Sequence, residues 1–170
     1  ENIDLVIISH DHYDHLDYYT IKKIKNNVKT FLVPHGVGNH LRSWGIDVDS
    51  IVELNWNQNF TIDGIEFVCL PARHFSGRGP LNRNSTLWSS WAIKSSNLKI
   101  YFSGDSGYGM HLKKIGEEHG PFDISLIDCG QYNLAWKYSH MFPEQAVTAA
   151  IDLKSKYFMP IHWGGFILAL

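Results

Sequence analysis

Three histidines and one aspartate lie close together near the start of the chain, in the pattern His-x-His-x-Asp-His. They are His10, His12, Asp14 and His15, and they follow the apolar run 4–8, which has the length of a buried strand. In an extended loop, His10, His12 and Asp14 would point one way and His15 another. Imidazole and carboxylate groups bind zinc, iron and manganese, so the stretch predicts a metal site with room for two ions. A solvated, histidine-rich turn is the alternative.

Further residues of ligand type follow other predicted strands. They are His74 after Ile65–Leu70, Asp105 after Leu98–Ser103 and His162 after Tyr157–Ile161. Strand ends on one side of a sheet gather at one edge, so these side chains are expected to converge. The alternatives are a structural histidine at His74 and a simple turn at Gly104-Asp105-Ser106-Gly107.

The elements that must position these residues alternate between strands and helices, which indicates an α/β class. Strands are predicted at 29–33, 51–54, 59–62, 65–70, 86–94, 98–103, 123–127 and 157–161, and helices at 18–27, 36–44, 108–119 and 140–153. Asp63-Gly64 predicts a hairpin turn. His111 and His119 are expected to face solvent. Residues 1–170 contain no repeat or linker and are interpreted as a single domain.

Composition narrows the class of protein. The chain has 170 residues, 44% of them hydrophobic and 19% charged, and a net charge of −2. These are globular values, and they give no reason to expect nucleic acid as a partner. The cysteines Cys69 and Cys129 form no disulfide framework or zinc knuckle, which favours a reduced, cytoplasmic setting. The first strand begins almost at Glu1 and residues 164–170 end abruptly, so a fragment lacking N-terminal strands and a C-terminal tail is expected.

The motif His10-x-His12-x-Asp14-His15 resembles the signature of the metallo-β-lactamase superfamily. That family has an αββα sandwich fold with one or two metals along one edge, and this chain has further ligand-type residues in the order of a two-metal member. The resemblance implies one metal on His10, His12 and His74, a second on Asp14, His15 and His162, and Asp105 as the bridge.

Several stretches are similar to one branch of the superfamily, which contains N-acyl-phosphatidylethanolamine phospholipase D and bacterial relatives of unassigned substrate. They are Ser9–Asp17, Ala72–Arg83 with Thr86-Leu87-Trp88, Tyr101–Gly109 and Ile161–Gly164. His140 matches a histidine that this branch places near the metals. Phe142 departs from the pattern, as does the stretch 128–131, where the branch has a more apolar turn with proline.

The resemblance implies a hydrolase in which two divalent ions, zinc first and manganese or iron otherwise, generate hydroxide from a bound water. A small-molecule or lipid phosphodiester is the expected substrate, with Asp14 orienting or deprotonating the nucleophile and His140 assisting the oxyanion or leaving group. Arg78 and Arg83, in a glycine-rich loop, are expected to bind the anion, or else are solvated. A lactonase or acyl-ester hydrolase, and an iron redox module, stay open, as does association with a membrane surface.

Overall fold

The computed structural model describes residues 2–164. They fall into two compact units. The first unit contains residues 2–56 and 75–88, and the second contains residues 57–74 and 89–164. The abrupt apolar end that the sequence analysis noted lies, from residue 165 on, outside the described residues.

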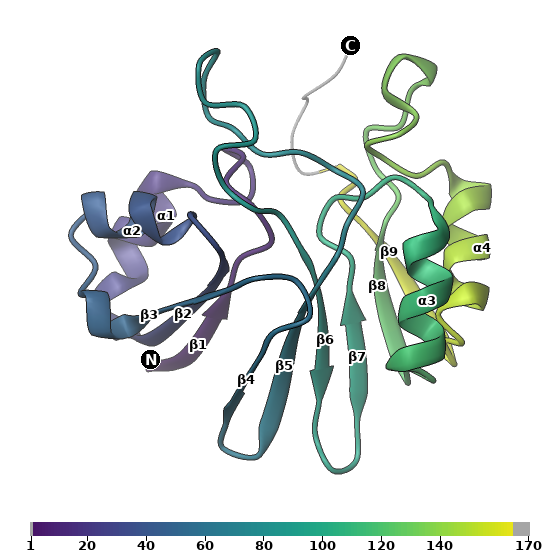
Figure 1. Cartoon of the computed structure of the whole chain (residues 1–170), viewed down its shortest axis with the longest axis horizontal. Coiled ribbons are helices and arrows are strands. Elements are labelled where there is room, and N and C mark those ends of the chain that lie inside the picture. Colours follow the sequence, from purple (N-terminus) through teal and green to yellow (C-terminus); the bar gives the residue numbers. More distant parts are fainter. Residues whose placement is uncertain (1, 165–170) are drawn as a thin grey trace. The chain divides into compact units, whose positions relative to one another are not determined.

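The first unit is built on a three-stranded parallel sheet in the order β1-β2-β3. Its strands are β1 (Ile3–Ile7), β2 (Val28–Pro34) and β3 (Ile51–Leu54), and its helices are α1 (Tyr18–Ile24) and α2 (Gly38–Ser43), with 3-10 turns at Lys25–Asn27 and Val48–Ser50 (Figure 1). The side chain of Asp17 accepts a hydrogen bond from the Thr20 amide at 2.7 Å and so fixes the start of α1. Gly45, with φ of 80°, follows α2 and ends it.

The core of this unit forms between the parallel sheet and its two helices. Fully buried side chains from the sheet, from the helices and from the loop before α1 contact one another, among them Phe31, Val33, Leu41 and Leu16. Leu16 directly follows the histidine-rich stretch. Its burial therefore anchors the end of that stretch to the core.

The second unit is built on a six-stranded sheet in the order β4-β5-β6-β7-β8-β9. The strands are β4 (Asn59–Ile62), β5 (Ile65–Leu70), β6 (Ser90–Lys94), β7 (Lys99–Phe102), β8 (Ile124–Asp128) and β9 (Tyr157–Ile161). Each pair of neighbouring strands from β4 to β7 is antiparallel, whereas β7, β8 and β9 are parallel to one another. It follows that β5, β7, β8 and β9 run in the same direction and end at the same edge of the sheet.

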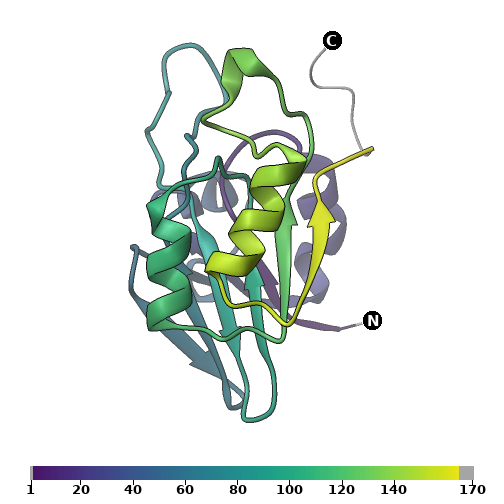
Figure 2. The same ribbon diagram turned by 90° about the vertical axis from the view of Figure 1, so that its right-hand side faces the viewer.

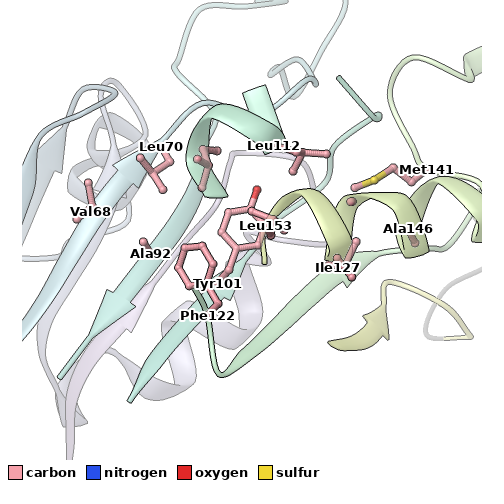
Figure 3. Packing of buried hydrophobic residues seen from close by; sticks show 13 residues of the cluster. Val68, Leu70, Ala92, Tyr101, Leu112, Phe122, Ile127, Met141, Ala146 and Leu153 are labelled. Carbon is pink, nitrogen blue, oxygen red and sulfur yellow. The ribbon is translucent and has the colours of Figure 1, made fainter. Parts of the chain in front are cut away.

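Two helices, α3 (Met110–Glu118) and α4 (Pro143–Asp152), lie side by side over one face of this sheet (Figure 2). Between them and the strands lies an apolar core in which the Tyr101 and Phe122 rings meet at a centroid distance of 5.5 Å (Figure 3). Pro143 occupies the first turn of α4, where its missing N–H costs nothing. A 3-10 turn at Leu134–Trp136 interrupts the long loop before α4.

Most predicted elements are confirmed, and β3, β4, β5 and β9 have the predicted bounds. Asp63 and Gly64 form the predicted hairpin turn, both with positive φ. The predicted strand 86–94 is too long, because β6 begins only at Ser90. Thr86 instead exchanges hydrogen bonds with the Ser76 hydroxyl, and the Leu87 amide donates to the His35 carbonyl. In the part of the chain that the structure describes, no helix is long and apolar enough to cross a membrane.

Candidate metal centre

The histidine-rich stretch of the first unit forms a turn at the exit of β1. The His12 carbonyl accepts hydrogen bonds from the His15 amide at 3.1 Å and from the Leu16 amide at 2.8 Å. The expectation that the whole stretch is extended was therefore wrong, because the chain turns after His12. Leu16, whose amide closes the turn, is fully buried in the core.

This turn brings all four predicted ligands of the first unit together. His10 Nε2 lies 2.9 Å from His12 Nδ1, and Asp14 Oδ2 lies 3.2 Å from His15 Nε2. The His10 and His15 rings are 4.2 Å apart between centroids, and His10 is only 1% exposed. Four imidazole and carboxylate groups held this close suit metal ligation better than a solvated turn.

Asp11, between the first two histidines, is a buried support of the turn that the sequence alone did not single out. It is fully buried, its Oδ2 lies 3.2 Å from His40 Nε2, and its Oδ1 accepts a hydrogen bond from the Gly77 amide at 2.7 Å. Burial raises the pKa of Asp11, but the hydrogen bonds from His40 and Gly77 and the charge of His40 outweigh it and lower the pKa below its ordinary value. Asp11 therefore stays ionised and ties the turn to α2 and to the loop after Phe75.

The two arginines of that loop have different surroundings. Arg78 Nη1 donates to the carbonyls of Asp11 and Leu16, each at 2.7 Å, and its guanidinium lies over the Tyr13 ring at 4.1 Å. These contacts support a role in holding the histidine-rich turn. Arg83 is exposed, and its guanidinium lies 4.6 Å from the Phe75 ring centroid. Binding of substrate by either arginine stays a prediction.

In the second unit, the predicted ligands gather where β5, β7 and β9 end. His74, Asp105 and His162 follow these strands, which run in the same direction. Asp105 Oδ2 lies 3.7 Å from His74 Nε2, and Asp105 Oδ1 lies 3.4 Å from His162 Nε2. The side chains of Asp105 and His74 are 3% and 2% exposed. The expected convergence at one sheet edge is confirmed for these three residues.

The orientation of His74 is fixed by its main-chain partner. Its Nδ1 lies 3.1 Å from the Ser139 carbonyl oxygen, which can only accept a hydrogen bond. The proton of neutral His74 is therefore on Nδ1, and the lone pair on Nε2 faces the Asp105 carboxylate. This is the arrangement in which a histidine binds a metal through Nε2 while its other ring nitrogen is held in place.

His140 also reaches this group, together with Asp128, which the sequence analysis had placed in a loop. The His140 ring stacks parallel on His162 at 5.3 Å, and its Nδ1 lies 3.0 Å from Asp128 Oδ2. Asp128 is the last residue of β8 and is fully buried. The signal that could have found it is the strand that precedes it, the same signal that singled out Asp105 and His162.

The donor set of the second unit fits a metal ion. Asp105, Asp128, His140 and His162 each offer one ligand atom, and these atoms lie within 4.8 Å of one another. Buried carboxylates beside imidazoles are costly unless protons or a cation compensate their charge. The second unit thus has a cluster of histidines and aspartates able to bind a metal.

The backbone of His162 has an unusual conformation. His162 has φ of 67°, in the left-handed region that residues other than glycine seldom adopt. Its carbonyl packs against Gly130, where a Cβ atom would lie only 1.5 Å from the His162 oxygen. The absence of a side chain at residue 130 is therefore needed for His162 to sit where it does.

His111 corrects the expectation that it faces solvent. Its Nε2 lies 3.2 Å from the Ser106 hydroxyl, next to Asp105 in the sequence. Burial, with a smaller effect from the charge of Arg73, lowers the pKa of His111 to about 4. A neutral histidine therefore supports the loop that carries Asp105.

The fold and these two groups of residues agree with a family model, the beta-lactamase superfamily domain, which matches residues 1–163. The chain belongs to this family. Its structure is similar to that of Igni18, a metallo hydrolase from Ignicoccus hospitalis, with a TM-score of 0.76, 23% identity, and coverage of 96% of this chain and 65% of that one. The metallo-β-lactamase fold class expected from the sequence is thereby confirmed.

Among curated relatives, an uncharacterized protein of Mycobacterium tuberculosis is 53% identical over 98% of this chain and 46% of its own length. The N-acyl-phosphatidylethanolamine-hydrolyzing phospholipase D 1 of Caenorhabditis elegans is 39% identical over 97% of this chain and 50% of its own length. The chain thus spans about half the length of the curated relatives it matches.

Proposed function

We propose that the protein is a metal-dependent hydrolase that acts on a phosphodiester through a centre of two divalent ions, zinc by preference. The observation that carries the proposal is that each unit holds its share of one ligand set, close-packed and in the order of a two-metal family member. Manganese and iron use the same ligand types and are the alternatives to zinc.

In this proposal His10, His12 and His74 would hold one ion, Asp14, His15 and His162 would hold the other, and Asp105 would contribute to both. When bound, two such ions supply a water-derived nucleophile at neutral pH and compensate the charge on the substrate oxygens. Asp14, whose carboxylate lies 3.2 Å from His15, would orient or deprotonate the nucleophile.

His140 assists the departing group. His140 Nδ1 is hydrogen-bonded to Asp128. His140 would therefore use Nε2 to stabilise the developing oxyanion or to protonate the leaving oxygen. The exposed Arg83 binds the phosphodiester anion, and Arg78 contributes to the same loop while it holds the turn. The substrate class, a small-molecule or lipid phosphodiester, is supported by the named activity of the Caenorhabditis elegans relative.

The test is metal content per chain in protein purified without added metal, measured beside hydrolysis of bis(p-nitrophenyl) phosphate and of a lactone. About two ions per chain with phosphodiester turnover is the expected result. Faster hydrolysis of the lactone would favour the acyl-ester alternative. Two iron ions with a visible absorption band and no hydrolysis would favour the redox module, and a chain without metal would overturn the proposal.

Single substitutions sharpen this test. His12→Ala and Asp105→Ala are expected to lose metal and turnover together, whereas His140→Ala is expected to keep the metal and lose about 10²–10⁴-fold in turnover. His35→Ala is the matched control, because His35 is exposed and lies outside both groups. Retention of both metals and full turnover in His12→Ala or Asp105→Ala would refute the ligand assignment.

A further inference from the structure

We propose that Asp128 is the positioning residue of the second unit: one carboxylate that sets the ring tautomers of both His140 and His162. The inference deepens the proposed function, on which its consequence for metal binding rests. Its structural part, the tautomers, concerns the protein with or without metal.

The contacts of Asp128 divide between its two oxygens. Oδ2 accepts a hydrogen bond from the Ser106 amide at 3.1 Å and lies 3.0 Å from His140 Nδ1. Oδ1 accepts from the Gly130 amide at 3.3 Å and lies 3.4 Å from His162 Nδ1. Each oxygen therefore faces one main-chain donor and one imidazole nitrogen.

Asp128 belongs to the group whose ligand atoms lie within 4.8 Å of one another, but this division of its contacts favours a role in supporting the two histidines over a role as a ligand itself. A carboxylate has about four acceptor positions, and four neighbouring nitrogens already face them. The side chain is fully buried, so water does not compete for these positions. A metal bound to Asp128 would have to displace at least one of these donors.

The consequence for the histidines follows from hydrogen-bond chemistry. An ionised carboxylate only accepts, so His140 Nδ1, which lies within hydrogen-bond distance of Asp128, must carry its proton. His162 Nδ1 lies 3.4 Å from Asp128 as an ion-pair contact without hydrogen-bond geometry, and the negative carboxylate favours a proton on this nitrogen too. In His162 this leaves the Nε2 lone pair facing Asp105 Oδ1 at 3.4 Å. Two acceptor atoms face each other favourably only with a cation or a proton between them, and ligating histidines usually donate their other ring N–H to a carboxylate or carbonyl.

The main chain holds Asp128 in this place. Its amide donates to the Ser103 hydroxyl at 2.8 Å, and the next amide, that of Cys129, donates to the Ile161 carbonyl at 3.0 Å. These bonds join β8 to the ends of β7 and β9. The carboxylate is thus fixed relative to the loops that carry Asp105 and His162.

The experiment measures histidine tautomers in metal-free protein by long-range ¹H–¹⁵N NMR, above the pH at which imidazoles are protonated. The wild type is expected to show protons on Nδ1 of both His140 and His162, assigned with the His140→Gln and His162→Gln variants. In Asp128→Asn, the amide offers one acceptor and one donor, so at least one of the two histidines is expected to change tautomer.

Zinc affinity, measured by chelator competition, is the second readout. Asp128→Asn is expected to weaken zinc binding about 10–100-fold, the usual effect of losing a carboxylate behind a ligating histidine. Asp152→Asn is the matched control, because Asp152 is another carboxylate of the second unit and accepts from the Tyr108 hydroxyl at 2.6 Å. It is expected to change neither the tautomers nor the affinity.

The outcomes separate the two proposals. If the wild type shows the Nδ1 tautomers and Asp128→Asn changes them, the inference holds. If in addition no zinc binds to the wild type, the proposed function fails but the inference about the tautomers stands. Wild-type histidines protonated on Nε2, or unchanged tautomers and zinc affinity in Asp128→Asn, would overturn the inference while leaving metal-dependent hydrolysis intact. Should Asp128→Asn fail to fold, the wild-type tautomers alone decide.

Discussion

Replacing Gly130 with alanine is expected to displace His162 and so to weaken metal binding by the proposed ligand set. The added Cβ would lie 1.5 Å from the His162 oxygen and 2.2 Å from its carbonyl carbon, whereas real Cβ atoms essentially never approach closer than 3.0 Å. The main chain of His162 must therefore move by about 1.5 Å, the difference between the two distances. Metal–nitrogen distances tolerate only about 0.2 Å, so a shift of this size removes His162 as a ligand.

The assay is zinc affinity of Gly130→Ala by chelator competition, beside its melting temperature without metal. Zinc binding is expected to weaken by more than the roughly 100-fold that follows loss of a supporting carboxylate, because here a ligand itself is displaced. Overpacking costs about 1–3 kcal/mol, which corresponds to a fall in melting temperature on the order of 2–12 °C for a chain of this size.

Gly116→Ala is the matched control. Its Cβ would lie 2.0 Å from the Asp152 oxygen, so it clashes with the main chain of α4 to a similar degree but at a distance in sequence from every proposed ligand. It is expected to lose stability and keep its zinc affinity. If Gly130→Ala binds zinc as the wild type does while Gly116→Ala is destabilised, the argument that Gly130 positions His162 is refuted.

Three further predictions concern other residues. The pKa of His111 is about 4 in the fold and 6.5 ordinarily, so the unfolded chain binds the extra proton and stability falls as the pH drops from 6.5 toward 4; His111→Gln should flatten this slope in melting curves. Burial raises the pKa of Cys69 to about 12, so iodoacetamide should label it at pH 8 only after unfolding, and labelling of native protein would contradict this. Arg78→Met should cost about 1–3 kcal/mol in denaturant unfolding through its lost carbonyl partners, whereas Arg83→Met should leave stability unchanged and raise KM; equal stability losses would refute the distinction.

Local signals in the sequence predict an element correctly where that element depends only on its own residues. Asp63-Gly64 defines a hairpin whatever surrounds it, because only a few residue types tolerate positive φ at both turn positions. The apolar run of β5 and the proline at the start of α4 are signals of the same kind. Such signals predict most strand bounds to within one residue, whereas the metallo-β-lactamase fold class was expected from the family resemblance.

Partners distant in the sequence decided the features that the sequence analysis missed. Residues 86–89 have the composition of a strand, but Thr86 and Leu87 bond to Ser76 and His35 and so leave the sheet. The turn after His12 is followed by Leu16, which packs against core residues far along the chain such as Phe31 and Leu41. A pattern of residue types does not show which distant residues will form hydrogen bonds. Here these tertiary contacts override the local preference for a strand.

The order of the strands could have predicted the role of Asp128, which its residue type alone did not indicate. Asp105 follows β7 and His162 follows β9, and in a parallel sheet of order β7-β8-β9 the last residue of β8 must lie between them. A carboxylate at that place faces both neighbouring loops, whereas a proline there could not. The rule that picked out ligands at strand exits therefore extends to the residue that orients them, provided that the order of the strands is known and not only their positions in the chain.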